Sequence, residues 1–320
     1  MLTLFHFDQG LLRQTVVEGA LDSLPEQTVW IDLLTPSRDD ETAISRLLNV
    51  DIPTHEEMQE IEVSSRLYED GGAQVMTMPV LTRAMTDEPE AAAVTFILAG
   101  SRLLTVRYVD PLPFGMFIRR LARQPALVGT GEVALVGLLE QIADRLADVL
   151  ESATADLEAI SRDIFRKEGA SGSGLKDILQ RIGRAGDLAT KAKDSLLGLN
   201  RLLLFLGGQT SIRKEVKLRM KTLMRDVTSI AEHATFLSTK VAFLLDATLG
   251  MINIEQNNVI KILTVASVAF LPPTLIASMY GMNFAFMPEL KWHLGYPWAL
   301  GLMFASAAIP FLYFRRKKWL

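Results

Sequence analysis

Apolar residues follow two different rhythms in the first part of the chain. The segment TVWIDLL at 28–34 is a short apolar run that ends at Thr35-Pro36, whereas residues 37–50 carry apolar positions at helical spacing after a cluster of acids. Two further segments, 66–81 and 92–109, are rich in β-branched side chains and each is interrupted at a glycine. The pattern predicts an amphipathic helix and two hairpins. We therefore expect an α+β domain over residues 1–131.

Helical periodicity dominates from residue 132 onward. Residues 132–167 and about 175–206 have apolar positions three and four apart, and the glycine-rich stretch EGASGSG at 168–174 predicts a break between them. A third segment then runs to Pro272 without an internal proline. Its sixty or so residues could extend roughly 90 Å as one helix. We therefore expect a helical region over 132–261 that includes a long stalk helix.

Two stretches near the end of the chain, 262–288 and 295–314, contain no charged side chain. Each holds an apolar segment close to the ~20 residues that a helix needs to cross about 30 Å of hydrocarbon. The flanking charges are Lys261 before the first stretch and, after the second, Arg315, Arg316, Lys317 and Lys318. The connecting loop carries only Glu289 and Lys291. An excess of basic residues marks the cytoplasmic side, so both ends should be cytoplasmic.

We therefore predict a transmembrane region over 262–320, with spans at about 262–280 and 297–314 and an outer loop at 281–296. The alternative is a pair of buried core helices in a soluble protein, but the basic flanks and the interfacial tryptophans Trp292, Trp298 and Trp319 argue against it. The N-terminus lacks the basic and apolar regions of a signal peptide. We therefore expect a protein of the cytoplasmic (inner) membrane. Its large N-terminal part should lie in the cytoplasm.

A mostly polar stripe, with members at steps of three or four residues, runs through the first span and the segment before it. The stripe consists of Asn253, Asn257, Ile260, Thr264, Ser267, Leu271, Thr274 and Ser278, and seven residues earlier it reaches Asp246. Such a helical face suits a water-filled path better than lipid. The alternative is that the hydroxyls bond their own helix backbone or hold helices together. One helix cannot enclose a path, so the stripe implies an oligomer.

Composition excludes several other kinds of protein. The net charge of −4, without a basic domain, argues against a nucleic-acid partner. The absence of cysteine removes disulfides, thiolate metal sites and cysteine nucleophiles. The sequence THEEM at 54–58 lacks the second histidine of a zinc-protease motif, and no phosphate-binding glycine loop is present. We therefore expect neither an enzyme nor an organic cofactor. A third possibility, a membrane anchor that conducts no ions, would leave the polar stripe unexplained.

The last seventy residues resemble the CorA magnesium transport family. The likeness rests on YGMNF at 280–284, MPELKW at 287–292, GYP at 295–297 and the basic C-terminus, all in the expected places around two spans. It implies a funnel-shaped homopentamer in which five copies of the first span surround the path of a transported Mg²⁺ ion. Membrane lipid and divalent cations would be the other partners.

The resemblance also implies roles for individual residues. Tyr280, Gly281, Met282 and Asn283 would form the selectivity filter. Because Mg²⁺ gives up its waters reluctantly, Asn283 would contact the ion through ion-bound water. The pore-lining residues would be Asp246, Asn253, Asn257, Thr264 and Thr274. A hydrophobic gate would consist of Ile260, Leu263 and Leu271, which could otherwise be ordinary helix-packing residues.

Charged residues at the two ends of the path have alternative interpretations. Glu289 could concentrate cations at the outer mouth, or it could be a solvated acid paired with Lys291. Lys261 with Arg315, Arg316, Lys317 and Lys318 could form a basic ring at the inner exit, although attraction to anionic lipid explains these residues equally well. The resemblance further implies gating by regulatory intracellular Mg²⁺. The acids that would bind it stay unassigned among Asp87, Glu88, Glu90, Asp226 and Glu232.

The main alternative function is a zinc or cobalt/nickel transporter of the same superfamily. Zinc prefers His and Cys ligands, and the stripe contains neither. Hydrated Co²⁺ and Ni²⁺ resemble hydrated Mg²⁺, so we expect them as secondary ions.

Overall fold

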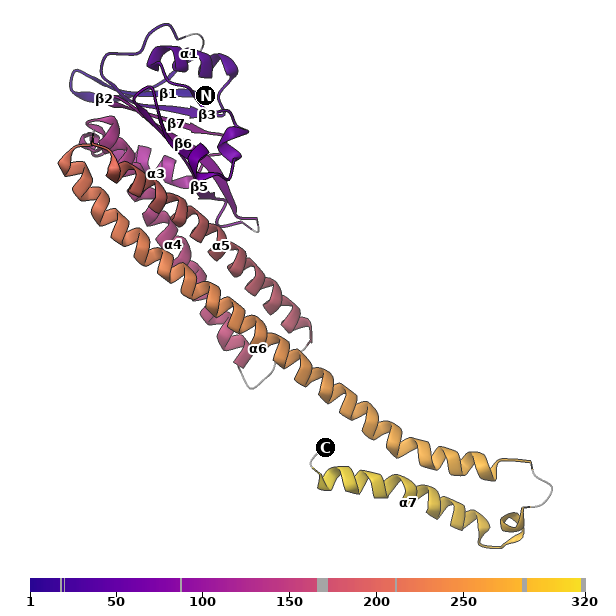
Figure 1. The fold of residues 1–320 in the computed structure, drawn as a ribbon. Coiled ribbons are helices and arrows are strands. Elements are labelled where there is room, and N and C mark those ends of the chain that lie inside the picture. Colours follow the sequence, from indigo (N-terminus) through magenta and orange to yellow (C-terminus); the bar gives the residue numbers. More distant parts are fainter. Residues whose placement is uncertain are drawn as a thin grey trace. The chain divides into compact units, whose positions relative to one another are not determined.

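A computed structural model describes residues 1–317 except residues 18, 20, 87, 166–171, 211 and 284–286. The chain divides into two compact units (Figure 1). Unit 1 comprises residues 1–169 and 177–245, and unit 2 comprises residues 170–176 and 246–320. The helix α6 (Lys214–Tyr280) belongs to both units.

Unit 1 is built on a seven-stranded mixed sheet with the strand order β2-β1-β3-β7-β6-β5-β4. The strands are β1 (Leu2–Asp8), β2 (Leu11–Val17), β3 (Thr28–Leu34), β4 (Leu67–Asp70), β5 (Ala73–Thr82), β6 (Glu90–Ala99) and β7 (Arg102–Arg107). All neighbours are antiparallel except β3 and β7. The strand at 28–34 and both predicted hairpins are confirmed, whereas the hairpin β1–β2 was not predicted.

Tight turns join three pairs of neighbouring strands. Each turn has two residues: Gln9-Gly10, Gly71-Gly72 and Gly100-Ser101. The first residue of each has a positive φ, and the second does so in the first two turns. Glycine adopts this conformation at little cost, and such turns match the twist of the strands they join. The glycines that interrupt residues 66–81 and 92–109 therefore fix where the chain reverses.

The predicted amphipathic helix is confirmed as α1 (Arg38–Leu48), which packs on one face of the sheet. Ser37 and Asp40 form a reciprocal capping box at its N-terminus, and Asn49 ends it in a left-handed conformation. Ile44 of α1 is fully buried in a cluster with Leu4 and Ile31 of the sheet. The end of β7 is also tied to α1, since the Tyr108 hydroxyl donates to Glu41 Oε1 at 2.8 Å. Burial and this hydrogen bond raise the pKa of Tyr108 to about 12.

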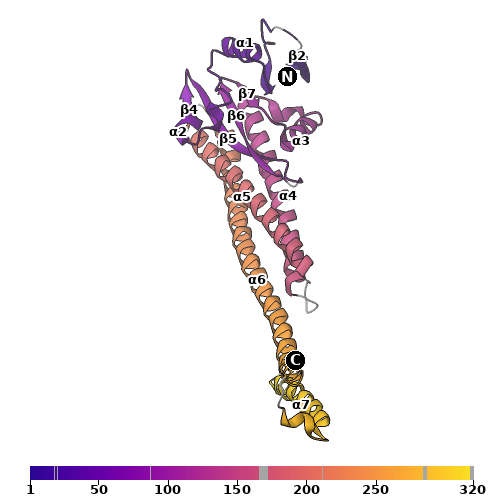
Figure 2. The ribbon, with the colours of Figure 1, turned by 90° about the vertical axis from the view of Figure 1, so that its right-hand side faces the viewer.

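The opposite face of the sheet is covered by α3 (Leu112–Leu121) and α4 (Gly131–Phe165) (Figure 2). Trp30 of β3 stacks on Phe5 and contacts Phe114 and Phe117 of α3. Helix α3 was not predicted. Its proline lies in the first turn, where proline's missing N–H costs no helical hydrogen bond.

A buried ion pair links strands β3 and β7. The Nε and Nη2 atoms of Arg107 donate to the two carboxylate oxygens of Asp32 at 3.1 and 2.8 Å, and Thr105 Oγ1 donates to Asp32 Oδ1 at 2.7 Å. The side chains of Arg107 and Asp32 are only 3% and 2% exposed. The guanidinium also lies 4.5 Å from the ring centroid of Phe114. A buried pair of this kind is tolerated because its hydrogen-bonding groups are satisfied.

Three long helices complete unit 1. They are α4, the part of α5 (Gly172–Gly208) from residue 177 onward, and the part of α6 up to residue 245. The predicted break at 168–174 is wrong at its end, because α5 already begins at Gly172 and so includes Gly174. Leu175 and Ile178 of α5 are buried. Because extending a packed helix costs less than starting one, the glycine-containing first turn is helical as well. Short 3₁₀ turns occur at Glu57–Gln59 (η1) and Pro125–Val128 (η2), and a four-residue helix, α2, at Val63–Arg66.

The start of α4 lies against the turn between β6 and β7. The Gly131 amide donates to Ser101 O at 2.7 Å. A Cβ atom on Gly131 would come within 2.5 Å of the Arg102 carbonyl carbon and the Leu103 nitrogen. Both are backbone atoms, so the strand itself would have to move. The glycine thus allows the helix to approach the sheet closely.

We expect Gly131→Ala to destabilise the protein by about 1–3 kcal/mol, the usual cost of overpacking a tight site. Denaturant unfolding of the purified full chain would measure this change. Gly183→Ala is the matched control, because no atom lies within 4 Å of its Cβ position and alanine favours a helix. Equal stability of the two variants would contradict the packing argument.

Candidate functional site

Within the described residues, two helices are long and apolar enough, by length and composition, to cross a membrane, and their apolar parts lie in unit 2. They are the last part of α6 and the whole of α7 (Gly295–Arg316). In each helix, only 6% of the apolar 18-residue stretch is buried. The core helices of a soluble protein would be mostly buried, so the alternative of two core helices finds no support in this chain.

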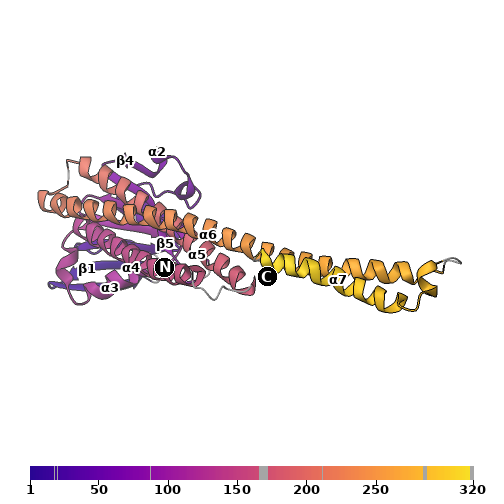
Figure 3. The same ribbon diagram turned by 90° about the horizontal axis from the view of Figure 1, so that it is seen from below.

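Helix α7 runs antiparallel beside the last part of α6 (Figures 1 and 3). On α6 the less exposed residues recur on one face, where Val265 is only 8% exposed and Ala269, Pro272 and Ile276 are half-buried. On α7, Ala299 is 6% exposed. We infer that these faces are turned toward each other. The helical assignment of α6 continues through Pro272 and Pro273 to Tyr280.

The predicted polar stripe lies on a different face of α6. All of its members are exposed in the single chain: Asp246, Asn253, Asn257, Ile260, Thr264, Ser267, Leu271, Thr274 and Ser278. At 100° per residue, the centre of the stripe lies roughly 140° around the helix axis from the face that contains Val265. The stripe is therefore left uncovered by α7.

Two threonines of the stripe bond their own helix. Thr264 Oγ1 donates to Ile260 O at 2.8 Å, and Thr274 Oγ1 donates to Phe270 O at 2.7 Å. These bonds follow the alternative in which hydroxyls satisfy themselves locally. They do not exclude a second contact, because a hydroxyl that donates its hydrogen keeps lone pairs that accept hydrogen bonds. Each threonine can still bind water on the exposed face.

The three residues predicted as a hydrophobic gate do not pack within the chain. Ile260 is 59% exposed, Leu263 62% and Leu271 65%. Their interpretation as ordinary packing residues would therefore require another chain or lipid to cover them.

The segment predicted as a filter begins where α6 ends, at Tyr280. The Gly281 amide still donates to Ala277 O at 2.9 Å, and the Met282 amide to Met279 O at 3.3 Å. A Cβ atom on Gly281 would lie 3.2 Å from Ala277 O, so the tight last turn favours glycine there. Met282 and Asn283 are exposed. The Asn283 amide thus lies just past a helix C-terminus, where the helix dipole is negative.

Part of the outer loop is described. Residues Pro288–Lys291 form a 3₁₀ turn, η3, and the rings of Trp292 and Trp298 are 6.3 Å apart. Glu289 lies on η3, but its side chain is outside the described part of the structure, so its pairing with Lys291 stays a prediction.

The predicted basic ring is exposed as far as the structure describes it. Lys261, Arg315, Arg316 and Lys317 are exposed, and Lys318 lies outside the described residues. Within the described residues, no group of three or more His, Asp or Glu side chains could hold a metal ion. Of the acids considered for regulation, Asp87 is not described and Glu90 lies 3.6 Å from Arg83.

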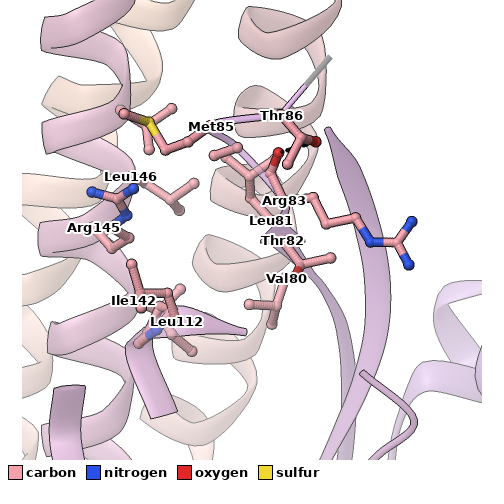
Figure 4. A pocket seen from close by; sticks show the side chains of 13 residues that line it. Val80, Leu81, Thr82, Arg83, Met85, Thr86, Leu112, Ile142, Arg145 and Leu146 are labelled. Atoms are coloured by element: carbon pink, nitrogen blue, oxygen red, sulfur yellow. Dashed lines mark hydrogen bonds between the residues drawn. The ribbon is translucent and has the colours of Figure 1, made fainter. Parts of the chain in front are cut away.

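A separate pocket of about 190 Å³ lies in unit 1 between the end of β5 and helix α4 (Figure 4). Its side chains are mainly apolar, such as Val80, Leu112, Ile142 and Leu146, with Arg145 beside them. None of the described residues that line it carries a carboxylate.

The polar stripe did not indicate which face of α7 is less exposed. Small residues of α7 at helical spacing mark that face in the sequence, and they were not used for the prediction: Gly295, Ala299 and Ala307. These positions are buried or half-buried.

Comparison with known proteins places these features in a family. The sequence model of the family described as "CorA-like Mg2+ transporter protein" matches residues 25–316. The magnesium transport proteins CorA of Salmonella typhimurium and Escherichia coli K12 are each 36% identical to this chain over 327 residues, with 100% of both chains covered. The corresponding protein of Pectobacterium atrosepticum is 35% identical over 320 residues, again with full coverage.

Solved structures share the fold. The complete CorA magnesium transporter from Methanocaldococcus jannaschii superimposes with a TM-score of 0.78 at 18% identity, covering 100% of this chain and 99% of that one. The full-length CmaX protein gives a TM-score of 0.66 at 15% identity, with 100% and 98% covered. The sheet domain, the long helix and the C-terminal helix thus form a known architecture.

Proposed function

Because the chain belongs to the CorA-like Mg²⁺ transporter family, we propose that it conducts Mg²⁺ into the cell through a path lined by α6. Its family comprises transporters rather than enzymes. The observation that carries the proposal is the polar face of α6 in unit 2, which is uncovered along its whole length. The 36% identity to magnesium transport proteins over the full chain supports Mg²⁺ as the ion.

Several copies of the chain would enclose the path. We propose a funnel-shaped homopentamer in the cytoplasmic membrane, with both termini in the cytoplasm and α7 outside the ring of α6 helices. The face of α6 that contains Val265 would contact α7, and the polar stripe would point toward the axis. An interior-negative potential supplies about 4.6 kcal/mol per 100 mV for a divalent ion, so no chemical fuel is needed.

The ion would keep most of its water. Mg²⁺ dehydrates reluctantly, and amide oxygens of Asn283 and Asn257 can bind its waters without holding the metal directly. Tyr280, Gly281 and Met282 would position Asn283 at the outer mouth, where Glu289 would raise the local cation concentration. Asn253, Thr264, Thr274 and Asp246 would continue the wet path toward the cytoplasm.

Closure would come from the apolar residues on the same face. Rings of Ile260, Leu263 and Leu271 can exclude water from a narrow path, which stops ion flow without a plug. Regulatory Mg²⁺ bound in the cytoplasmic region would stabilise this closed state, provided that the closed state binds the ion more tightly. Lys261 and Arg315, Arg316, Lys317 and Lys318 would surround the inner exit or anchor it to anionic lipid.

Co²⁺ and Ni²⁺ would be secondary ions, because their hydrated forms resemble hydrated Mg²⁺. Zinc transport is the alternative within the superfamily. The exposed face of α6 offers amides, hydroxyls and one carboxylate rather than the imidazole and thiolate ligands that zinc favours.

Asn257 and Asn258 provide a matched test of which face lines the path. Both are exposed, but Asn258 is turned about 100° from its neighbour, away from the stripe. We expect Asn257→Ala to lower Mg²⁺ uptake into proteoliposomes by at least about tenfold, which corresponds to about 1.4 kcal/mol in the barrier. Asn258→Ala should stay within about twofold of the unmodified protein. The reverse order would place the path on another face.

Asn283→Ala should reduce Mg²⁺ uptake to background, because the outer mouth would lose its water-binding amides. Size-exclusion chromatography in detergent should show an unchanged assembly, which separates a filter defect from a folding defect. Normal uptake by a correctly assembled variant would refute the filter assignment.

Regulation and ion preference can be measured together. Proteoliposomes loaded with increasing internal Mg²⁺ should take up Mg²⁺ progressively more slowly when the rate is compared at equal driving force. Uptake should be fastest for Mg²⁺, measurable for Co²⁺ and Ni²⁺, and slowest for Zn²⁺. A rate independent of internal Mg²⁺ would contradict the gating proposal, and a preference for Zn²⁺ would favour the alternative function.

A further inference from the structure

Strand β2 forms an uncovered edge of the sheet in unit 1. It pairs with β1 on one side, and within the described residues no other strand pairs with its second side. Most of its side chains are exposed, including Leu11 at 62% and Val16 at 48%. The strand contains no proline and a single charge, Arg13. An edge of this kind can accept another strand, and proteins usually protect such edges.

The turn before β2 determines which backbone groups face outward. Asp8 and Leu11 are directly opposite across the two-residue turn Gln9-Gly10, and residues in that position exchange their backbone hydrogen bonds. The backbone groups of Leu11 therefore face β1. Because the direction alternates along a strand, the free N–H and C=O groups belong to Leu12, Gln14 and Val16. The same alternation on β1 is seen at Phe7, whose amide bonds Gln27 O on the β3 side.

We propose that this edge pairs with β2 of a second copy of the chain in an antiparallel arrangement centred on Gln14. Gln14 would lie opposite Gln14 of the second copy, and Leu12 would lie opposite Val16. All the free backbone groups then meet in hydrogen-bonded pairs, which gives about six intermolecular hydrogen bonds.

The side chains of β2 favour this register. It places the apolar pairs Leu12–Val16 and Leu11–Val17 across from each other, and Arg13 opposite Thr15. Val17 already packs against the buried cluster beneath α1, so Leu11 of the second copy would extend that cluster. The register centred on Arg13 would instead place two like charges directly opposite, which is destabilising.

The contact would be two-fold symmetric, since each copy uses the same strand. A ring of copies around a transport axis uses contacts of a different kind, in which two distinct surfaces meet. Pairing through β2 would therefore join chains of two separate rings. Each hydrogen bond contributes only about 1 kcal/mol net, so a single pair is weak. The inference does not depend on the transported ion.

Crosslinking can test the proposal, because the chain contains no cysteine. In the full chain, Gln14→Cys would place two thiols opposite each other at the symmetry centre, with about 5.5 Å between Cα atoms, which suits a disulfide. We expect oxidation in membranes to give covalent dimers at least about tenfold faster than for Glu69→Cys. Glu69 is the matched control, since it is exposed on β4 at the opposite edge of the same sheet. Equal rates would overturn the proposal.

A second variant separates strand pairing from chance collision. Val16→Lys places a charge at a half-exposed edge position opposite Leu12 of the second copy, and should reduce crosslinking of Gln14→Cys to the rate of the control. Light scattering of the crosslinked Gln14→Cys protein in detergent should show particles with at least twice the mass of one ring, because every copy in a ring carries a free β2 edge. Crosslinking that is insensitive to Val16→Lys, or particles with the mass of a single ring, would refute the pairing.

Discussion

Hydrocarbon offers no hydrogen-bond partners, and this constraint governs how the C-terminal helices can be used. An amide side chain turned toward lipid would lose the hydrogen bonds that water gives it. On the exposed stripe of α6, the amides of Asn253 and Asn257 lie before the predicted span, and within the span the stripe carries the hydroxyls of Thr264, Ser267, Thr274 and Ser278. Water or another copy of the chain would give this face the partners that lipid lacks. In the proposed assembly the stripe would face a wet axis.

The same face combines two kinds of surface with opposite affinities for water. In the proposed path Asn253 and Asn257 would hold water, whereas Ile260, Leu263 and Leu271, which follow them along α6, would repel it. A path lined in this way can be wet or dry depending on its width. Small movements of α6 helices relative to one another would then be enough to open or close it.

Local signals in the sequence predicted local structure well. A glycine marked the turn of each predicted hairpin, and the acids after Ser37 marked the start of α1. The hairpin β1–β2 was missed because Arg13, Gln14 and Thr15 interrupt the apolar residues of its exposed second strand. Helix α3 was not predicted, and it tolerates Pro113 because a proline in the first turn costs no helical hydrogen bond. The pairing of Asp32 with Arg107 joins residues 75 apart, which no spacing rule could indicate.

For the candidate site, helical spacing was sufficient to find the polar stripe, because one face of one helix is a local property. The covering of the opposite face depends on where α7 returns, and that is a tertiary property. The number of copies in the proposed assembly would depend on contacts between chains, so no pattern within one chain determines it.

The hydroxyl hydrogens of Thr264 and Thr274 are already committed to their own helix. These side chains can therefore only accept hydrogen bonds from water molecules, including those around an ion in the proposed path. Water molecules around a cation point their hydrogens outward, while those around an anion point their oxygens outward. Such a wall would favour positive ions through the orientation of their hydration shells, with no formal charge that could trap them.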